Sequence, residues 1–283
     1  MKPTTDIEAS FLENGDLFHD PFYKRFNLRH APAPLRLTDE ISKNYTFPTF
    51  YGDVTCAIGI FLCDYEKAQA MMPHPEMKPV KMTMGRSLVI FSCYIYNNVM
   101  NVAPYNEIAM TIPVMVKPNW NPPVLPMIMS GAFKKFGYYV FSMPVTSLEN
   151  KIRGRKIWGL PKEVQEIDIV EKDGDCITTA MEETGETYFQ LNVPTSGKAT
   201  DFDVSSYLYS RLGDELLQSQ TCFKATFNVN KYMKLLLKKD LEPDRPYLTL
   251  GDTESAKALR DLEIEKHPFQ FRFARGMTAC FDL

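Results

Sequence analysis

The sequence is divided into many short segments rich in β-branched and aromatic residues, with short spacers between them. Few spacers are long enough to hold a helix that crosses over between parallel strands. This pattern predicts an α+β domain with a large, mainly antiparallel and closed sheet, a β-barrel with a few flanking helices. The strand candidates are residues 54–63, 87–96, 105–116, 137–145, 164–170, 176–182, 187–193, 222–229, 247–250 and 267–281.

Three short helices are expected among the strands. Asp64 is a suitable N-cap for residues 64–72, and Pro73 follows as a terminator. Residues 206–219 carry leucines at a spacing of four, which is typical of a helix. A third helix is expected at residues 253–262.

Turn and loop signals divide the rest of the chain. Asp173 and Gly174 are expected to turn between two strands as a hairpin. Residues 1–50 contain several prolines and little apolar periodicity, so they are expected to form an irregular N-terminal arm. Residues 51–283 are then expected to form a single barrel domain.

Charge and composition argue against several classes of protein. The formal net charge is -3, without the basic excess of a nucleic-acid-binding protein. The chain has no Gly-rich nucleotide-binding motif, no apolar run of membrane-spanning length and no recognisable secretion signal, so a cytoplasmic protein is expected. The six cysteines lack CxxC spacing and are expected to be buried free thiols. The four histidines lack metal-site spacing, so neither a metal nor a cofactor is expected.

Lys162 ends the segment GRKIWGLPK, residues 154–162. An amine is nucleophilic only when unprotonated, and the free lysine pKa of about 10.4 keeps almost all of it protonated at neutral pH. An apolar pocket, to which Trp158 and Leu160 are suited, would lower this pKa by desolvating the ammonium. Nearby cations would lower the lysine pKa further. The alternative is a lysine on the solvated surface, which is the more common case. The nearby cations are Arg153, Arg155 and Lys156.

Glu107 is the only charged residue in the apolar, strand-like stretch from Val99 to Val116. A carboxylate buried there without a partner would be costly. Three interpretations remain open: a side chain on the solvent face of a half-buried strand, a member of a structural ion pair, or a buried acid beside a site.

Together, GRKIWGLPK and the upstream YNEIAMTIPV, residues 105–114, resemble the lysine and glutamate segments of the acetoacetate decarboxylase family. The order and approximate spacing agree from about residue 51 to about residue 193. The resemblance implies a closed, cone-like barrel, usually a homo-oligomer, acting on a small keto acid. It assigns Lys162 as the nucleophile that forms an imine with a β-keto acid, a use of lysine long attributed to acetoacetate decarboxylase itself. It assigns Glu107 as the site acid.

The sequence departs from the family pattern at three positions. Glu163 stands where family decarboxylases carry a second lysine, and two orientations are open. Successive strand residues point to opposite sides, which favours Glu163 facing away from Lys162. If Glu163 contacts Lys162 instead, its negative charge would raise the lysine pKa and oppose catalysis. Val54 and Ser92 stand at the positions of an arginine and a second glutamate. These three residues, with Arg155 and Trp158, are the candidate substrate-binding residues. The proline-rich segment 117–127 lengthens one connection and is consistent with a lid, an oligomer contact or an ordered surface loop.

Three functions are compatible with this pattern. The first is a Schiff-base-forming lyase acting on a keto acid larger than acetoacetate, by decarboxylation or by related aldol or dehydration chemistry. The second is a catalytically inactive small-molecule-binding protein on the same barrel. The third, a hydrolase with another nucleophile, is the weakest, because the sequence has no GxSxG motif.

Overall fold

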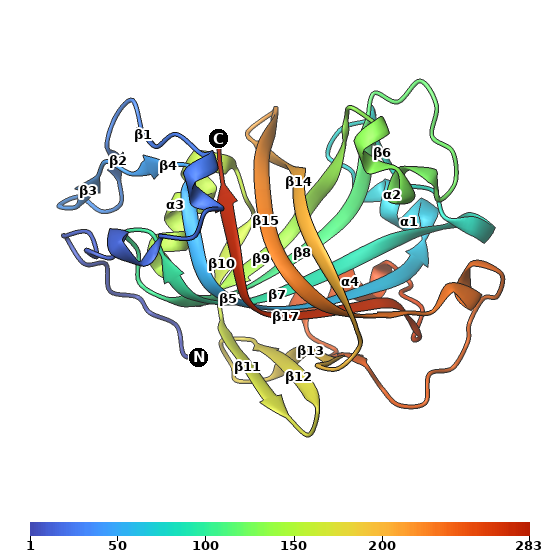
Figure 1. The fold of residues 1–283 in the computed structure, drawn as a ribbon. Helices are drawn as coiled ribbons and strands as arrows, with labels where there is room; N and C mark the ends of the chain where they lie inside the picture. The colour runs from blue at the N-terminus through green and yellow to red at the C-terminus, as the bar shows by residue number, and fades with distance from the viewer.

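The computed structural model describes the backbone of residues 1–283 and every side chain except that of Ser130. Seven strands run in the order β9, β14, β15, β17, β5, β7, β8, and β8 pairs again with β9, so the sheet closes into a barrel (Figure 1). Neighbouring strands are antiparallel except β9 and β14. The predicted α+β fold with a closed, mainly antiparallel barrel is confirmed. The barrel strands are β5 (Thr49–Asp64), β7 (Arg86–Val99), β8 (Tyr105–Val116), β9 (Phe136–Val145), β14 (Lys198–Leu212), β15 (Glu215–Lys231) and β17 (Pro268–Phe281).

A second, antiparallel sheet covers part of the outside of the barrel. Alternate residues of β5 therefore enter two different cores: Ile58 and Ile60 pack inside the barrel, whereas Phe61 packs against the second sheet. At Gly59 a side chain would come within 2.9 Å of Leu191 in that sheet. Burial of both faces explains why β5 reads as a continuous apolar run. The second sheet consists of β11 (Glu166–Lys172), β12 (Asp175–Met181), β13 (Thr187–Pro194) and β16 (Leu248–Leu250).

Two of the expected helices are present. The Asp64 side chain accepts a hydrogen bond of 2.9 Å from the backbone N–H of Lys67 and caps α1 (Tyr65–Ala70). The other is α4 (Glu254–Asp261), beside the second sheet. The expected hairpin turn at Asp173 and Gly174 joins β11 to β12, with positive φ at both residues.

The helix expected over residues 206–219 is wrong, because this stretch forms the hairpin of β14 and β15. Gly213 and Asp214 make its turn, and Leu212 pairs with Glu215. A spacing of four residues fits the helical period of 3.6, but it also fits the strand period of 2. Leu208, Leu212 and Leu216 therefore could not distinguish the two, and the Gly-Asp dipeptide was the better signal.

Helix α3 (Leu148–Trp158) was not expected from the sequence. The Ser147 side chain caps its start by accepting a hydrogen bond from the backbone N–H of Asn150, at 3.3 Å. Gly159, with a left-handed φ of 61°, ends it. Figure 1 shows α3 at the end of the barrel where the N-terminal segment also lies.

Residues 1–48 contain only short elements. Two-residue strands pair as β1 (Arg29–His30) with β4 (Thr46–Phe47), and as β2 (Leu35–Arg36) with β3 (Ser42–Lys43). The remaining short strands and helix are β6 (Met77–Pro79), β10 (Lys162–Val164) and α2 (Leu125–Ile128). The 3-10 turns are Gly15–Leu17, Tyr23–Arg25, Thr83–Gly85, Ser130–Ala132 and Met233–Leu236.

All six cysteines are free and buried, as predicted. Among the helices that the structure describes, none has the length and apolar character needed to cross a bilayer.

Candidate active site

The chain delivers Lys162 to the barrel directly after α3. Gly159 makes the left-handed bend, and a side chain there would come within 2.7 Å of the Arg211 carbonyl oxygen. After Leu160 and Pro161, β10 begins at Lys162 and pairs in parallel with β9, opposite Met143. The tight turn therefore requires glycine and fixes where the lysine side chain starts.

The side chains of Lys162 and Glu107 meet inside the molecule. Both residues are 5% exposed, and Nζ of Lys162 donates a hydrogen bond of 2.5 Å to Oε2 of Glu107. The hydroxyl of Tyr96 donates to the other carboxylate oxygen at 3.2 Å. Nζ also lies 5.6 Å from the centre of the Tyr105 ring. Of the three interpretations of Glu107, the solvent-facing one is excluded, and the side chain is both buried and ion-paired.

Burial is the main influence on the amine. It lowers the pKa of Lys162 below its usual 10.5, because the ammonium loses its hydration. Glu107 opposes this shift by attraction and hydrogen bonding, and Arg153 adds to it by repulsion. Arg153 is itself buried, with hydrogen bonds to Asn150 and Thr49 at 3.0 and 3.1 Å. Burial also raises the pKa of Tyr96 well above its usual value, so this phenol stays neutral.

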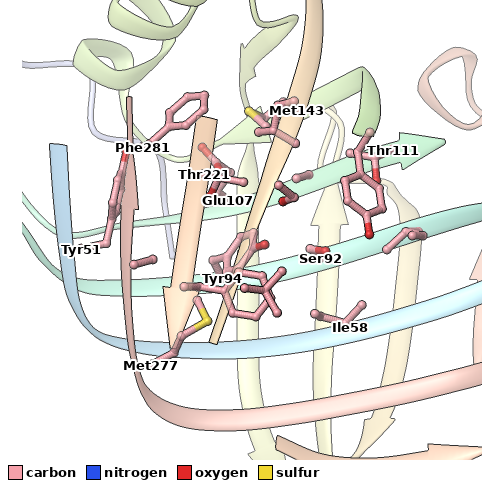
Figure 2. Close-up of a pocket in the computed structure, with 18 of the residues that line it drawn as sticks. Tyr51, Ile58, Ser92, Tyr94, Glu107, Thr111, Met143, Thr221, Met277 and Phe281 are labelled. Carbon is pink, nitrogen blue, oxygen red and sulfur yellow. The ribbon is translucent and has the colours of Figure 1, made fainter. Parts of the chain in front are cut away.

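Lys162 and Glu107 line a cavity of about 290 Å³ inside the barrel. Most of its wall is aliphatic or aromatic, and the hydroxyl groups are those of serine, threonine and tyrosine. Figure 2 shows residues of β5, β7, β8 and β17 projecting into this space. A small apolar molecule with few polar groups would fit such a wall. Its lining includes Tyr51, Ile58, Ser92, Tyr94, Tyr96, Ala109, Thr111, Met127, Met143, Leu160, Phe202, Arg272, Met277 and Phe281.

Of the five candidate substrate-binding residues, the structure brings only Ser92 to this lining. Arg155 and Glu163 pair with each other on the outer surface, where Lys151 also contacts Glu163 at 2.8 Å. Glu163 therefore points away from Lys162, as strand alternation predicts.

Trp158 and Val54 do not line the cavity. The Trp158 indole stacks on Phe281 with ring centres 4.9 Å apart, and donates to the Asp282 carbonyl oxygen at 3.2 Å. Val54 is fully buried in the packed core and does not reach the cavity. For these two residues, position along a segment did not predict what packs between the side chain and the cavity.

Segment 117–127 is held by contacts with the barrel and supplies part of the lining. Val124 donates a backbone hydrogen bond of 2.7 Å to Lys81, and the Asn121 amide donates to the Pro79 carbonyl at 3.0 Å. Met127 reaches the cavity, whereas Trp120 is 67% exposed. Met127, Tyr96 and Arg272 are lining residues that the sequence analysis did not single out. Among the described residues, no group of three or more His, Cys, Asp or Glu side chains is placed to hold a metal ion.

The fold and the site define a class: a closed β-barrel with an internal cavity and a buried amine in its wall. The family model described as acetoacetate decarboxylase (ADC) matches residues 32–219, more than half of the chain. The chain therefore belongs to the acetoacetate decarboxylase family, and it is an enzyme of that type by family.

Solved structures share the fold at low sequence identity. Acetoacetate decarboxylase from Legionella pneumophila subsp. pneumophila str. Philadelphia 1 is 14% identical with a TM-score of 0.53, over 82% of this chain and 84% of that chain. The enduracididine biosynthesis enzyme MppR, solved with pyruvate, is 10% identical with a TM-score of 0.56, over 88% and 96%. No curated protein matches significantly. At these identities the solved structures show the fold alone.

Proposed function

We propose that this protein is a Schiff-base-forming lyase whose Lys162 attacks the carbonyl group of a keto acid larger than acetoacetate. The observation that carries the proposal is the buried Lys162–Glu107 pair on the wall of an internal apolar cavity. A lysine desolvated in this way has a larger fraction of neutral, nucleophilic amine at a given pH.

In the proposed mechanism the neutral amine of Lys162 adds to the carbonyl carbon, and the carbonyl electron pair moves to oxygen. The amine becomes neutral when the ammonium of the ion pair gives a proton to Glu107, and Glu107 passes this proton to the alkoxide, which becomes a hydroxyl group. Glu107 then takes the proton that the nitrogen loses and delivers it to the hydroxyl group, which leaves as water. The resulting iminium withdraws electrons from the neighbouring bonds. Tyr96 holds the second oxygen of Glu107, so the carboxylate stays turned toward the amine. The roles of Lys162 as nucleophile and of Glu107 as proton carrier both depend on the 2.5 Å contact between Nζ and Oε2.

Several reactions can proceed from this iminium, including decarboxylation, aldol cleavage and dehydration. MppR was solved with the condensation product of pyruvate and imidazole 4-carboxaldehyde, an example of carbon–carbon chemistry on the same fold. The resemblance places the family arginine at Val54 and the second glutamate at Ser92. Of these two positions only Ser92 lines the cavity, and the rest of the wall is largely apolar. Loss of a charge-assisted contact to a carboxylate typically weakens binding roughly tenfold to a hundredfold. Slow turnover of acetoacetate and faster turnover of bulkier keto acids are therefore expected.

A panel of keto acids incubated with borohydride, with intact mass as the readout, tests the proposal. Reduction of an imine adds a stable, substrate-derived mass to Lys162, and peptide mapping locates it. Lys162→Ala removes the adduct, and Lys162→Arg removes it too, because guanidinium stays protonated. An undiminished adduct in Lys162→Ala would exclude this nucleophile. Acetoacetate turnover with kcat/KM above about 10⁴ M⁻¹s⁻¹, with bulkier keto acids inert, would overturn the substrate assignment.

One observation favours the second candidate, an inactive binding protein. The short contact with Glu107 stabilises the ammonium form of Lys162 and so works against imine formation. If keto acids bind in the cavity but borohydride traps no adduct at any pH up to 10, the protein is an inactive binding protein.

A further inference from the structure

The cavity contains a third charged side chain, Arg272, which the chemistry above does not use. Of the residues that line the cavity, only Lys162, Glu107 and Arg272 are formally charged. Lys162 and Glu107 form an ion pair and compensate each other. The guanidinium of Arg272 therefore leaves the cavity with an uncompensated positive charge.

Arg272 is partly buried and differs from the buried cations in its polar partners. Lys43 and Arg86 are paired with Glu149 and Glu265, and Arg153 donates hydrogen bonds to Asn150 and Thr49. Within the part of the chain that the structure describes, no carboxylate pairs with Arg272, and its buried Nε has no hydrogen-bond partner. Its Cζ lies over the ring of Phe202, 4.8 Å from the ring centre, on the cavity wall.

An arrangement of this kind is costly unless a ligand completes it. A buried charge without a counterion loses hydration and gains nothing in return. Arginine stays protonated even where burial lowers its pKa, as it does here. Its planar fork of N–H donors matches a carboxylate, and stacking on an aromatic ring orients the fork.

The barrel places Arg272 far from the lysine. It lies on β17, three strands from β8 and Glu107, which is the largest separation that a ring of seven strands allows. Paired residues also run from Arg272 through Ile58 and Ser92 to Ala109, two residues beyond Glu107. Two residues correspond to about 7 Å along a strand. Arg272 and the Lys162–Glu107 pair thus start from opposite walls and different heights.

We propose that Arg272 binds the carboxylate of the substrate, and that this carboxylate is separated from the reacting carbonyl by an apolar chain that spans the cavity. The inference rests on the proposed imine chemistry of Lys162 for the position of the carbonyl. It defines the substrate class as elongated keto acids with a remote acid group. Such an acid group is too far from the iminium to leave as carbon dioxide. If the substrate has no other acid group, the reaction is therefore an aldol cleavage or a dehydration.

The test compares 7-oxooctanoate with its methyl ester, which has the same carbonyl and chain but no charge. Borohydride trapping on Lys162 is measured over a range of concentrations for each compound. In the wild type the acid is expected to reach half-saturation at roughly tenfold to hundredfold lower concentration than the ester. In Arg272→Met this ratio falls to near one, and Arg272→Lys restores part of it. The matched control is Arg275→Met on the same strand, whose exposed side chain pairs with Glu171, and it retains the wild-type ratio.

Equal half-saturation for acid and ester in the wild type, or a preference that persists in Arg272→Met, would overturn the inference. Octanoate, which has no carbonyl, separates this outcome from failure of the imine chemistry. Calorimetry is expected to show octanoate binding to the wild type and at least tenfold weaker binding to Arg272→Met. If no carbonyl compound is trapped, the proposed function fails, but this difference still supports the anion site. Octanoate binding that is absent, or equal in the two proteins, counts against the anion site itself.

Discussion

Glu107 has two opposite effects on the amine that it contacts. Its carboxylate attracts the ammonium form of Lys162 and so raises the lysine pKa, yet in the proposed mechanism it is also the base that takes the amine's proton. Arg153 acts in the other direction by repelling the ammonium. Because burial is the largest influence and lowers the pKa, the two neighbours adjust a value set mainly by the apolar surroundings.

These opposing influences predict opposite shifts in two variants. The rate of imine formation is expected to rise with pH as the Lys162 ammonium loses its proton. In Glu107→Gln the attraction is lost, so the midpoint of this rise moves to lower pH, although the plateau rate falls because the base is gone. In Arg153→Met the repulsion is lost, so the midpoint moves to higher pH. The pH profile of borohydride trapping measures both shifts.

The control for this pair is Glu163→Gln. Glu163 is next to Lys162 in sequence, but it is exposed and bound to Arg155 and Lys151 on the outer surface. Its removal is expected to leave the midpoint nearly unchanged. Shifts of the same sign in Glu107→Gln and Arg153→Met would contradict the electrostatic explanation.

At the level of secondary structure, most strands were predictable because each has a strong apolar pattern of its own, whereas β14 was not. Strand β8 begins and ends where the sequence indicated, at Tyr105 and Val116. Helix α3 was not predictable in the same way. Its sequence, LENKIRGRKIW, has few apolar residues and a central glycine, and its ends depend on the Ser147 cap and the Gly159 bend. Such a helix is fixed by its caps and its tertiary contacts more than by its own pattern.

The candidate site shows the same division between local and long-range information. Lys162 and Glu107 could be singled out because each stands in a distinctive local segment. Arg272 could not, because the strand that carries it joins the cavity through pairings with β15 and β5 that lie far away in sequence. Arg155 was assigned to the site by its position in the lysine segment, but the helix turns it outward.

The central glycine of α3 yields a prediction about this element. The aliphatic part of Lys162 passes directly over Gly154, and a methyl group there would lie 2.7 Å from Cε and closer still to Cδ. Replacing a helical glycine by alanine normally stabilises a helix by up to about 1 kcal/mol. Gly154→Ala is instead expected to destabilise the protein, because the methyl group displaces the lysine from Glu107. The rate of imine trapping is expected to fall at least tenfold.

Gly15→Ala is the matched control for this substitution, because no atom lies within 4 Å of the position that its methyl group would take. It is expected to leave trapping unchanged. Trapping by Gly154→Ala at the wild-type rate would show that the lysine does not need the space that glycine provides.

At the scale of the whole molecule, the N-terminal segment braces the helix that carries Arg153 and Gly154. Lys43 on β3 forms a buried ion pair of 3.0 Å with Glu149 on α3, and the Tyr45 hydroxyl donates to the same carboxylate oxygen at 2.5 Å. The Arg153 guanidinium lies 4.3 Å from the centre of the Tyr45 ring. We therefore propose that residues 1–50 fold together with the barrel and unfold with it in a single transition.

A double-mutant cycle on Lys43 and Glu149 measures this coupling. Each single change, Lys43→Met or Glu149→Leu, leaves one charge buried without its partner and is expected to lower the free energy of unfolding by about 3–5 kcal/mol. The double variant leaves neither charge, so its loss is expected to be well below the sum of the two single losses. Chemical denaturation, followed by far-ultraviolet circular dichroism, provides all four values.

The same cycle on Lys266 and Glu242, both 72% exposed, is the reference for a solvated pair and is expected to couple by less than about 1 kcal/mol. The buried pair also has a consequence at the site, because loosening α3 moves Arg153 away from Lys162. Each single variant is therefore expected to shift the midpoint of imine trapping to higher pH, in the direction of Arg153→Met. Additive stability losses, two separate unfolding transitions, or an unshifted midpoint would mean that the segment is attached to the barrel without bracing the helix.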